Sequence, residues 1–267
     1  MGKLGIVLAG GGGKGAYQVG VWKYLHKRGM DRDIAVISGA SVGSLNAVLL
    51  GLYGADVAAD VWLHRIQPYI LSAHSESQVE KMLYPRGGRG SVLDVFSSLL
   101  ENGMFSSEGL QFLLESYVDE RAIKECGYRI YATCTAVKDG LLSSENILLN
   151  RLSKDSIVKT LLASSALPGV FGTVNMNRQQ YADGGILDNE PIYPLVEEGC
   201  TDAIIIRLSQ RQRNRVHPAG MNITEICPSE ALGNFITGAL DFSSQGAERR
   251  ISLGYRDAAA QLSQSPL

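Results

Sequence analysis

Three short motifs hold the residues that could do chemistry in this chain. They are the glycine-rich loop Gly10-Gly11-Gly12-Gly13-Lys14-Gly15, the serine motif Gly39-Ala40-Ser41-Val42-Gly43, and the acidic motif Asp183-Gly184-Gly185. A serine attacks a carbonyl only when a base removes its proton. Consecutive glycines at the start of a helix bring backbone N–H groups close to an anion. Together the motifs supply a candidate nucleophile, a candidate base and a candidate oxyanion cradle, which are the parts of acyl transfer.

The serine motif has the G-x-S-x-G pattern of a nucleophile elbow. Gly39 and Gly43 allow a sharp turn that exposes the Ser41 hydroxyl at the carboxyl end of a strand. The apolar run over 34–38 predicts that strand, and the helical spacing of apolar residues over 45–52 predicts a helix after the turn. A tight strand-to-helix turn without chemistry has the same pattern, so the neighbouring glycine-rich loop is what favours the catalytic interpretation.

The glycine-rich loop also resembles two cofactor-binding patterns. A dinucleotide-binding G-x-G-x-x-G loop is followed about 20 residues later by an acidic residue at the end of the second strand, and Ser38-Gly39-Ala40-Ser41 stands there instead. A P-loop places Gly where Leu8 stands, and Ser or Thr where Gly15 stands. We therefore expect an oxyanion cradle and not a nucleotide-binding loop.

Two residues compete for the role of the base. Asp183 ends a short run after Tyr181-Ala182, and Gly184 and Gly185 leave room beside it, although an ordinary Asp-Gly turn looks the same. His217 follows the serine and an aspartate in hydrolase order, so a Ser–Asp–His217 triad is the rival mechanism. The polar segment 211–217 around His217 is typical of a solvated loop, and we favour Asp183.

Aspartate is the weaker base by its intrinsic chemistry. A free Asp has a pKa of ~3.9 against ~6.5 for His, a difference of about 2.6 units. Either burial raises the pKa of the Asp183 carboxyl, or strong stabilisation of the oxyanion lowers the demand for proton removal.

The three motifs, in this order, resemble those of the patatin-like phospholipases, a family of lipid acyl hydrolases that use a Ser–Asp dyad. Two further stretches fit the resemblance: Asn189-x-Pro191 after the aspartate, and Ala163-Ser164-Ser165-Ala166-Leu167-Pro168-Gly169 before it. All of these matches fall within residues 6–191. Lys14 stands where the family more often has Arg.

The resemblance implies both a fold and a set of roles. The implied fold is a three-layer α/β/α domain with a mostly parallel central sheet. Ser41 would be the nucleophile, Asp183 the base, and residues 10–15 the oxyanion hole, with Gly184, Gly185 and Asn189 as supporting residues. The implied substrate is a phospholipid or another fatty-acyl ester, cleaved without metal or cofactor.

The element pattern agrees with an α/β fold in a single domain over residues 1–267. Apolar runs predict strands at 4–9, 34–38, 128–136, 140–149, 203–208 and 222–227. Helices are predicted after Gly15, over 153–166 with Ser153 as N-cap, from Asn189 with Pro191 in the first turn, and over 244–262. The mostly helical insertion 57–126 is a possible lid or acyl-chain wall, above all its part 84–106.

The composition is that of an ordinary globular protein. Of the 267 residues, 45% are hydrophobic and 19% charged, which excludes a disordered chain. Lys and Arg number 25 against 27 Asp and Glu, a net charge of -2, whereas a nucleic-acid binder would carry a basic excess. The four cysteines form no C-x-x-C pair, so we expect reduced thiols.

The sequence predicts neither a signal peptide nor a transmembrane segment. Its longest strongly apolar stretch, 47–55, is far shorter than the ~20 residues of a membrane-spanning helix. We therefore expect a cytoplasmic protein, with peripheral contact at the inner membrane face as an open alternative. Five loop arginines could meet anionic headgroups there, although solvated loop charge is the simpler interpretation: Arg86, Arg89, Arg211, Arg213 and Arg215.

A non-enzymatic alternative keeps the same fold. A lipid-binding or regulatory protein could retain the architecture while having lost turnover. The intact serine, aspartate and glycine-rich loop favour the hydrolase.

Overall fold

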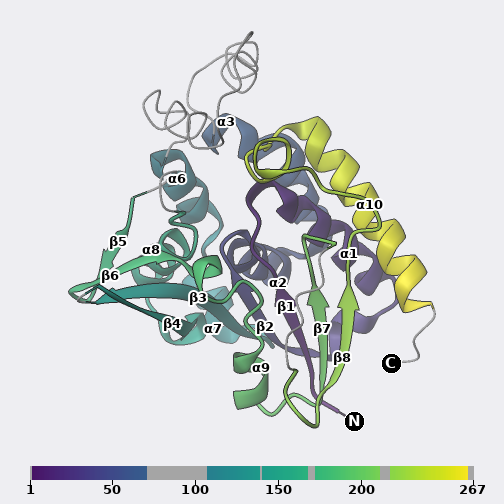
Figure 1. Cartoon of the computed structure of the whole chain (residues 1–267), viewed down its shortest axis with the longest axis horizontal. Helices are drawn as coiled ribbons and strands as arrows, with labels where there is room; N and C mark the ends of the chain where they lie inside the picture. The colour runs from purple at the N-terminus through teal and green to yellow at the C-terminus, as the bar shows by residue number, and fades with distance from the viewer. Residues whose placement is uncertain (1, 71–106, 139, 168–171, 211–216, 264–267) are drawn as a thin grey trace.

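A computed structural model describes residues 2–70, 107–138, 140–167, 172–210 and 217–263 (Figure 1). Of the predicted lid 57–126, residues 71–106 lie outside the described ranges, as do Pro168, Gly169 and the five loop arginines considered for headgroup contact.

Eight strands form one sheet in this part of the chain. They are β1 (Leu4–Leu8), β2 (Ile34–Ala40), β3 (Arg129–Lys138), β4 (Leu141–Leu148), β5 (Val174–Met176), β6 (Gln179–Asp183), β7 (Asp202–Ile206) and β8 (Asn222–Ile226). The strand order is β5-β6-β3-β2-β1-β7-β8, and β4 also pairs with β3. The run β3-β2-β1-β7-β8 is parallel, whereas the pairs β3–β4, β3–β6 and β5–β6 are antiparallel. The sheet is therefore mixed, with a parallel centre.

The helices connect and cover these strands. The longer ones are α1 (Ala16–Lys27), α2 (Val42–Asp60), α6 (Ser107–Tyr117), α8 (Lys154–Ser164) and α10 (Ser244–Leu262), with α3 (Ile66–Ile70), α7 (Glu120–Glu125) and α9 (Tyr193–Glu197) shorter. Six short 3-10 or π turns complete the described elements: η1 (Gly12–Gly15), η2 (Met30–Asp33), η3 (Val61–Arg65), η4 (Leu149–Arg151), η5 (Gly184–Ile186) and η6 (Phe235–Ala239).

The core lies on both faces of the sheet because alternate strand residues point to opposite sides. Ile6 and Ile204 point to the larger core, which α1, α2, α8 and α10 cover. Val7 and Ile205 point to the smaller core on the other face, where Leu195 of α9 packs. Figure 1 shows α10, in yellow, lying along α1. Helices on both faces confirm the predicted α/β class.

One helical run, Val42–Ile70, is long and apolar enough to cross a membrane by length and composition. It comprises α2, η3 and α3, and Gly54 breaks its helical backbone with φ 74° and ψ -178°. The most apolar part of the run is 61% buried inside the protein, as in a core helix.

The ends of the helices test the predicted caps. The Ser153 side chain accepts from the Ser156 N–H at 3.5 Å and so caps α8, as predicted. The prediction for Pro191 is wrong, because α9 begins at Tyr193 and the proline in its first turn is Pro194. Both prolines fit a first turn, where no backbone N–H is needed, so the sequence alone does not separate them.

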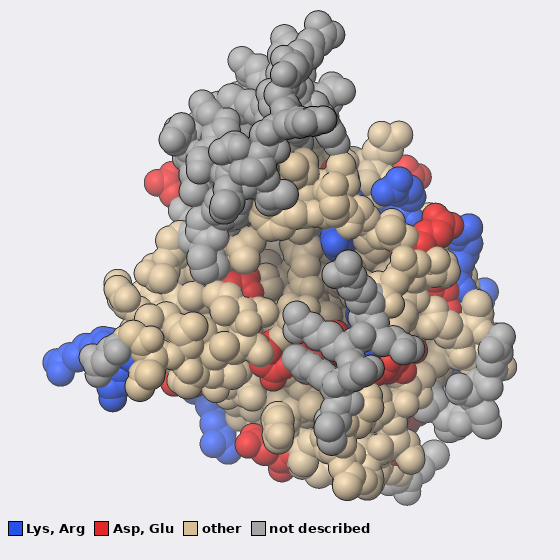
Figure 2. Space-filling model, viewed as in Figure 1, with Lys and Arg blue, Asp and Glu red and all other residues tan. Residues whose placement is uncertain are grey.

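Charge is dispersed over the surface. On the face drawn in Figure 2, blue and red residues are interspersed, and the described residues form no continuous basic patch there. This distribution agrees with the near-neutral net charge of -2.

Candidate active site

Ser41 occupies the turn between β2 and α2 in a strained conformation. Its backbone has φ 52° and ψ -129°, and β2 ends one residue before it while α2 begins one residue after it. A positive φ at a residue other than glycine costs on the order of 1–3 kcal/mol, and it persists only where the surrounding structure enforces it. This is the sharp strand-to-helix turn that the G-x-S-x-G pattern predicts.

The elbow glycines allow this turn because backbone packs directly on backbone. A Cβ at Gly43 would lie 2.0 Å from the Leu8 carbonyl oxygen, and a Cβ at Gly39 would lie 2.3 Å from the Gly43 carbonyl carbon. A side chain at Gly43 would push α2 away from β1, and a side chain at Gly39 would push α2 away from β2. Gly39 and Gly43 therefore hold Ser41 at the carboxyl end of the central strands.

Ser164 supports the elbow from α8. Its hydroxyl is fully buried, accepts from the Ser41 N–H at 3.0 Å and the Ser44 hydroxyl at 3.0 Å, and donates to the Thr133 carbonyl at 2.7 Å. One side chain therefore joins the elbow, α2, α8 and β3. The sequence contained a signal for this residue, since Ser164 lies in the stretch 163–169 that resembles the family, but no role followed from the pattern.

Strand pairing brings Ser41 and Asp183 together. β4 pairs with 131–138 along one edge of β3, so β2 and β6 must share the other edge. Along that edge, Ala40 pairs with Thr133 and Asp183 pairs with the next residue, Cys134. Because β2 runs parallel and β6 antiparallel to β3, their carboxyl ends meet head to head, and Ser41 follows directly on Ala40.

Asp183 is buried at this junction. Asp183 is 3% exposed and its carboxylate accepts from the Gly185 N–H at 2.7 Å, and both Asp183 and Ser41 line the same cavity. Burial raises the pKa of the carboxyl from its ordinary 3.8 to about 6, and the Ser41 side chain and the Gly185 N–H oppose this rise. Asp183 is thereby a stronger base than a free aspartate, and it is still ionised at neutral pH.

Asn189 ties the acidic motif to the glycine-rich loop. The Gly10 N–H donates to the Asn189 carbonyl at 3.2 Å, and the Asn189 side-chain amide donates to the Gly10 carbonyl at 3.3 Å. Gly12 has a φ of 57°, and a Cβ there would lie 2.1 Å from the Ala239 carbonyl oxygen. Among the described residues, no acceptor bonds to the N–H groups of Gly11 and Gly12. These two donors are therefore available to a ligand.

A cavity of about 300 Å³ joins these groups. Its polar end is formed by Gly10, Gly11, Gly12, Ser41, Asp183, Gly185 and Asn189. Apolar side chains line much of the rest, including Leu45, Ile70, Leu110, Phe235, Leu240 and Phe242. A second cavity of about 80 Å³, with Trp62 and Leu114 in its wall, shares Leu45, Ile70, Leu110 and Phe242 with the first. The arrangement places a polar reaction centre at one end of an apolar pocket.

The remaining predicted residues lie around this cavity. Gly13, Lys14 and Gly15 belong to η1 and do not line it. Gly184 packs on β3, where a Cβ would lie 2.0 Å from the Thr133 carbonyl oxygen. The sequence does not predict the walls formed by Phe235, Leu240 and Phe242, since apolar residues in a loop carry no signal of what they line.

His217 lies apart from the serine. Its Nε2 pairs with Glu225 Oε1 at 3.2 Å, the side chain is 39% exposed, and it does not line the cavity that holds Ser41 and Asp183. The triad that would use His217 is therefore not assembled in this structure. Among the described residues, no cluster of His, Cys, Asp and Glu could hold a metal ion.

The fold and the site define an α/β protein that presents a serine on an elbow turn, beside a buried carboxylate and a glycine-rich loop. A family model of patatin-like phospholipases matches residues 6–196. The chain belongs to the patatin-like phospholipase family, as its motifs predict.

Relatives of this chain are longer proteins. An uncharacterized NTE family protein of Mycobacterium bovis is 26% identical over 224 residues, which are 83% of this chain and 53% of that protein. Lysophospholipase NTE1 of Kluyveromyces lactis is 25% identical over 200 residues, 74% of this chain and 12% of that protein. This chain thus spans about half the length of the mycobacterial relative, and a much smaller part of the yeast one.

A solved structure shares the fold. VipD from Legionella pneumophila matches 98% of this chain and 67% of its own, with a TM-score of 0.57 and 16% sequence identity.

Proposed function

We propose that this protein is a lipid acyl hydrolase that cleaves carboxylic esters of fatty acids, with Ser41 as nucleophile and Asp183 as base. The observation that carries the proposal is the meeting of β2 and β6 on β3, which brings Ser41 and the buried Asp183 carboxyl together at the polar end of an apolar cavity. Membership in the patatin-like phospholipase family and the likeness to lysophospholipase NTE1 support a lipid ester as substrate.

The proposed reaction has two halves. Ser41 Oγ attacks the ester carbonyl while its proton passes to Asp183, and the carbonyl electron pair moves onto oxygen. The N–H groups of Gly11 and Gly12 stabilise that oxyanion. As the intermediate collapses, the ester C–O bond breaks and the leaving alcohol takes the proton from Asp183. Water then attacks the acyl-enzyme with Asp183 as base, releasing the fatty acid and restoring Ser41.

The raised pKa of Asp183 supports its role as base. With a pKa of about 6, the Asp183 carboxyl is mostly ionised at pH 7. Its basicity approaches that of histidine, whose free pKa is ~6.5. Removing one oxyanion donor from an enzyme of known mechanism costs roughly 100-fold to 1000-fold in kcat. Two free N–H groups therefore complement a base that is still weaker than the usual one.

The acyl chain is proposed to lie in the apolar cavity. Leu45 from α2, Leu110 from α6 and Phe242 are in contact with both the larger and the smaller space, so the two together form a route for a hydrocarbon chain away from Ser41. A lid function for the insertion 57–126 and peripheral contact with a membrane remain predictions. Deleting part of 84–106 is expected to change the preference for long over short acyl esters.

The first experiment combines a labelling reagent with a panel of substrates. A fluorophosphonate probe is expected to label the wild type and not Ser41→Ala. Hydrolysis of p-nitrophenyl esters and lysophospholipids is expected to be lost in both Ser41→Ala and Asp183→Asn.

His217→Ala serves as the control variant and is expected to keep most of the activity. A folded His217→Ala protein without activity would favour the triad instead. Wild type that binds lipid but neither reacts with the probe nor hydrolyses any ester would favour the non-enzymatic lipid-binding protein.

A further inference from the structure

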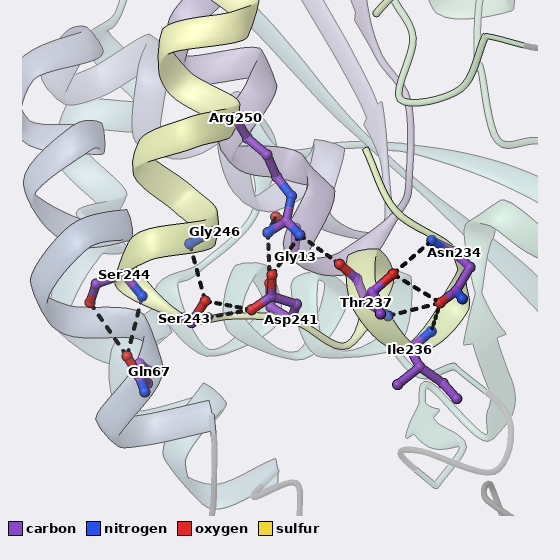
Figure 3. A network of polar contacts seen from close by, with 10 residues as sticks. All are labelled: Gly13, Gln67, Asn234, Ile236, Thr237, Asp241, Ser243, Ser244, Gly246 and Arg250. Atoms are coloured by element: carbon purple, nitrogen blue, oxygen red, sulfur yellow. Dashed lines mark hydrogen bonds and ion pairs between the residues drawn. The ribbon is translucent and has the colours of Figure 1, made fainter. Parts of the chain in front are cut away.

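A buried arginine of the C-terminal helix contacts the back of the glycine-rich loop. Arg250 of α10 is 1% exposed, and its guanidinium reaches three backbone carbonyls: Gly13 at 3.4 Å, Asp241 at 2.9 Å and Thr237 at 3.0 Å. It also pairs with the Asp241 carboxylate at 2.7 Å. Figure 3 shows this side chain pointing from the helix toward all three residues. Arg250 lies outside the part of the chain that the family model matches, 6–196.

Arg250 binds the segment 234–241 through Thr237 and Asp241, and the same segment packs against the glycine-rich loop. Asn234 caps η6 by accepting from the N–H groups of Ile236 and Thr237, both at 2.8 Å. Ala239 in this segment comes so close to Gly12 that any Cβ on that glycine would clash with its carbonyl oxygen. The loop, η6 and α10 thus form one packed unit with Arg250 at its centre.

Peptide groups connect Arg250 to a candidate oxyanion donor. Arg250 Nη1 donates to the Gly13 carbonyl, and the N–H of that same peptide group belongs to Lys14. The Lys14 N–H donates to the Gly11 carbonyl at 3.3 Å, and the N–H of that second peptide group belongs to Gly12. The Gly12 N–H has no acceptor among the described residues and lies on a residue that lines the cavity beside Ser41.

We propose that Arg250 is a positioning residue that orients and polarises the Gly12 N–H through these two peptide groups, and so strengthens it as an oxyanion donor. The inference rests on the proposed ester hydrolysis. Hydrogen bonds in a chain polarise one another, and the effect is largest where the chain is buried and one end is charged. The pKa of the Lys14 ammonium is lowered, first by burial and second by the positive charge of Arg250. The electrostatic field of Arg250 therefore reaches the glycine-rich loop.

The test uses two substitutions and an exposed control on the same helix. Arg250→Lys keeps the positive charge but loses the planar guanidinium that reaches several carbonyls at once. Arg250→Gln keeps an N–H donor but loses the charge. Arg249→Lys changes an exposed residue of the same helix. Each protein carries ¹⁵N-labelled glycine and lysine, and thermal unfolding checks that it folds. We expect the amide protons of Gly12 and Lys14 to move upfield in the order wild type, Arg250→Lys, Arg250→Gln.

Two controls accompany the amide readout. Gly39 and Gly43 do not belong to the two peptide groups that connect Arg250 to Gly12. The chemical shifts of their amide protons are therefore expected to be the same in every variant. Arg249→Lys is expected to leave the Gly12 and Lys14 signals unchanged.

Kinetics supply the second readout. Because a lost oxyanion donor lowers kcat by roughly 100-fold to 1000-fold, a weakened donor is expected to lower it by about 10-fold or more. The KM for a p-nitrophenyl ester is expected to stay within about two-fold. Affinity for a trifluoromethyl ketone, which forms a tetrahedral oxyanion adduct, is expected to fall in step with kcat, while fatty-acid binding is unchanged.

Each outcome decides between the alternatives. Two results would overturn the proposal and leave Arg250 as a purely structural residue. One is folded Arg250 variants in which the Gly12 and Lys14 amide protons do not shift. The other is folded variants in which KM and fatty-acid binding change but kcat does not. If the wild type hydrolyses no ester and the probe does not label Ser41, the proposed function fails. The amide shifts then still decide whether Arg250 acts on Gly12.

Discussion

Replacing Asp183 by asparagine is expected to stabilise the protein while removing its activity. The Asp183 carboxyl is 3% exposed, and burial raises its pKa from 3.8 to about 6. Between these two values the folded protein binds more protons than the unfolded chain. The free energy of unfolding therefore falls as pH rises from about 4 to about 6, and above pH 6 the whole decrease is present.

The size of this cost follows from the shift in the pKa of Asp183. Each unit is worth about 1.36 kcal/mol, so a shift from 3.8 to about 6 corresponds to about 3 kcal/mol at pH 8. Asparagine has nearly the same shape, and its oxygen can still accept from the Gly185 N–H, which lies 2.7 Å from the carboxylate in the native protein. Asp183→Asn is therefore expected to raise the free energy of unfolding by about 3 kcal/mol at pH 8, and by less than about 1 kcal/mol at pH 4.

Urea denaturation at pH 4, 6 and 8 measures these differences. Ser41→Ala is the matched control, because it also removes the proposed activity but keeps the carboxylate, and it should retain the loss of stability between pH 4 and pH 6. A variant Asp183→Asn that is no more stable than wild type at pH 8, or whose advantage is the same at pH 4 and pH 8, would refute the reasoning about the buried charge.

Four further outcomes follow from the site. The kcat/KM for a neutral ester is expected to rise with pH through a midpoint of about 6 as Asp183 ionises; a flat profile from pH 4 to 8 would contradict its role as base. Ser164→Ala removes the acceptor of the Ser41 N–H, while the Ser44 hydroxyl can still donate to the Ser41 carbonyl, and calorimetry should find a loss of about 1–3 kcal/mol. Gly43→Ala forces α2 off β1, so the fluorophosphonate probe should no longer label Ser41. Leu110→Trp fills part of the apolar cavity and, if the acyl chain binds there as proposed, should shift kcat/KM toward shorter acyl esters.

The sequence was most informative where local rules determine the structure. The apolar runs predicted the parallel strands, and the G-x-S-x-G pattern predicted a turn that the positive φ of Ser41 confirms. Ser153 was identified as a cap because its hydroxyl bonds only three residues along the chain. Family membership was also predictable, since three motifs in one order leave little room for chance.

Other features depend on contacts between distant parts of the chain, which no local pattern encodes. The head-to-head meeting of β2 and β6 follows from the register of β3, and neither strand reveals it alone. Arg250 lies 237 residues from Gly13 and reads in the sequence as one more arginine on an amphipathic helix. The error at Pro191 has a different cause, because two nearby prolines satisfied the same rule and the packing of α9 selected Pro194.

The edge of β3 that β2 and β6 share determines the distance between Ser41 and Asp183. The separation between the serine and the acid is determined by one step from Thr133 to Cys134, and not by the lengths of the segments that lead to them. Insertions between β2 and β3, or between β4 and β5, can therefore lengthen, shorten or reshape the approach to the cavity without changing that spacing. Such a scaffold allows the size and shape of the molecules that reach the cavity to vary in evolution, while Ser41 and Asp183 stay in register.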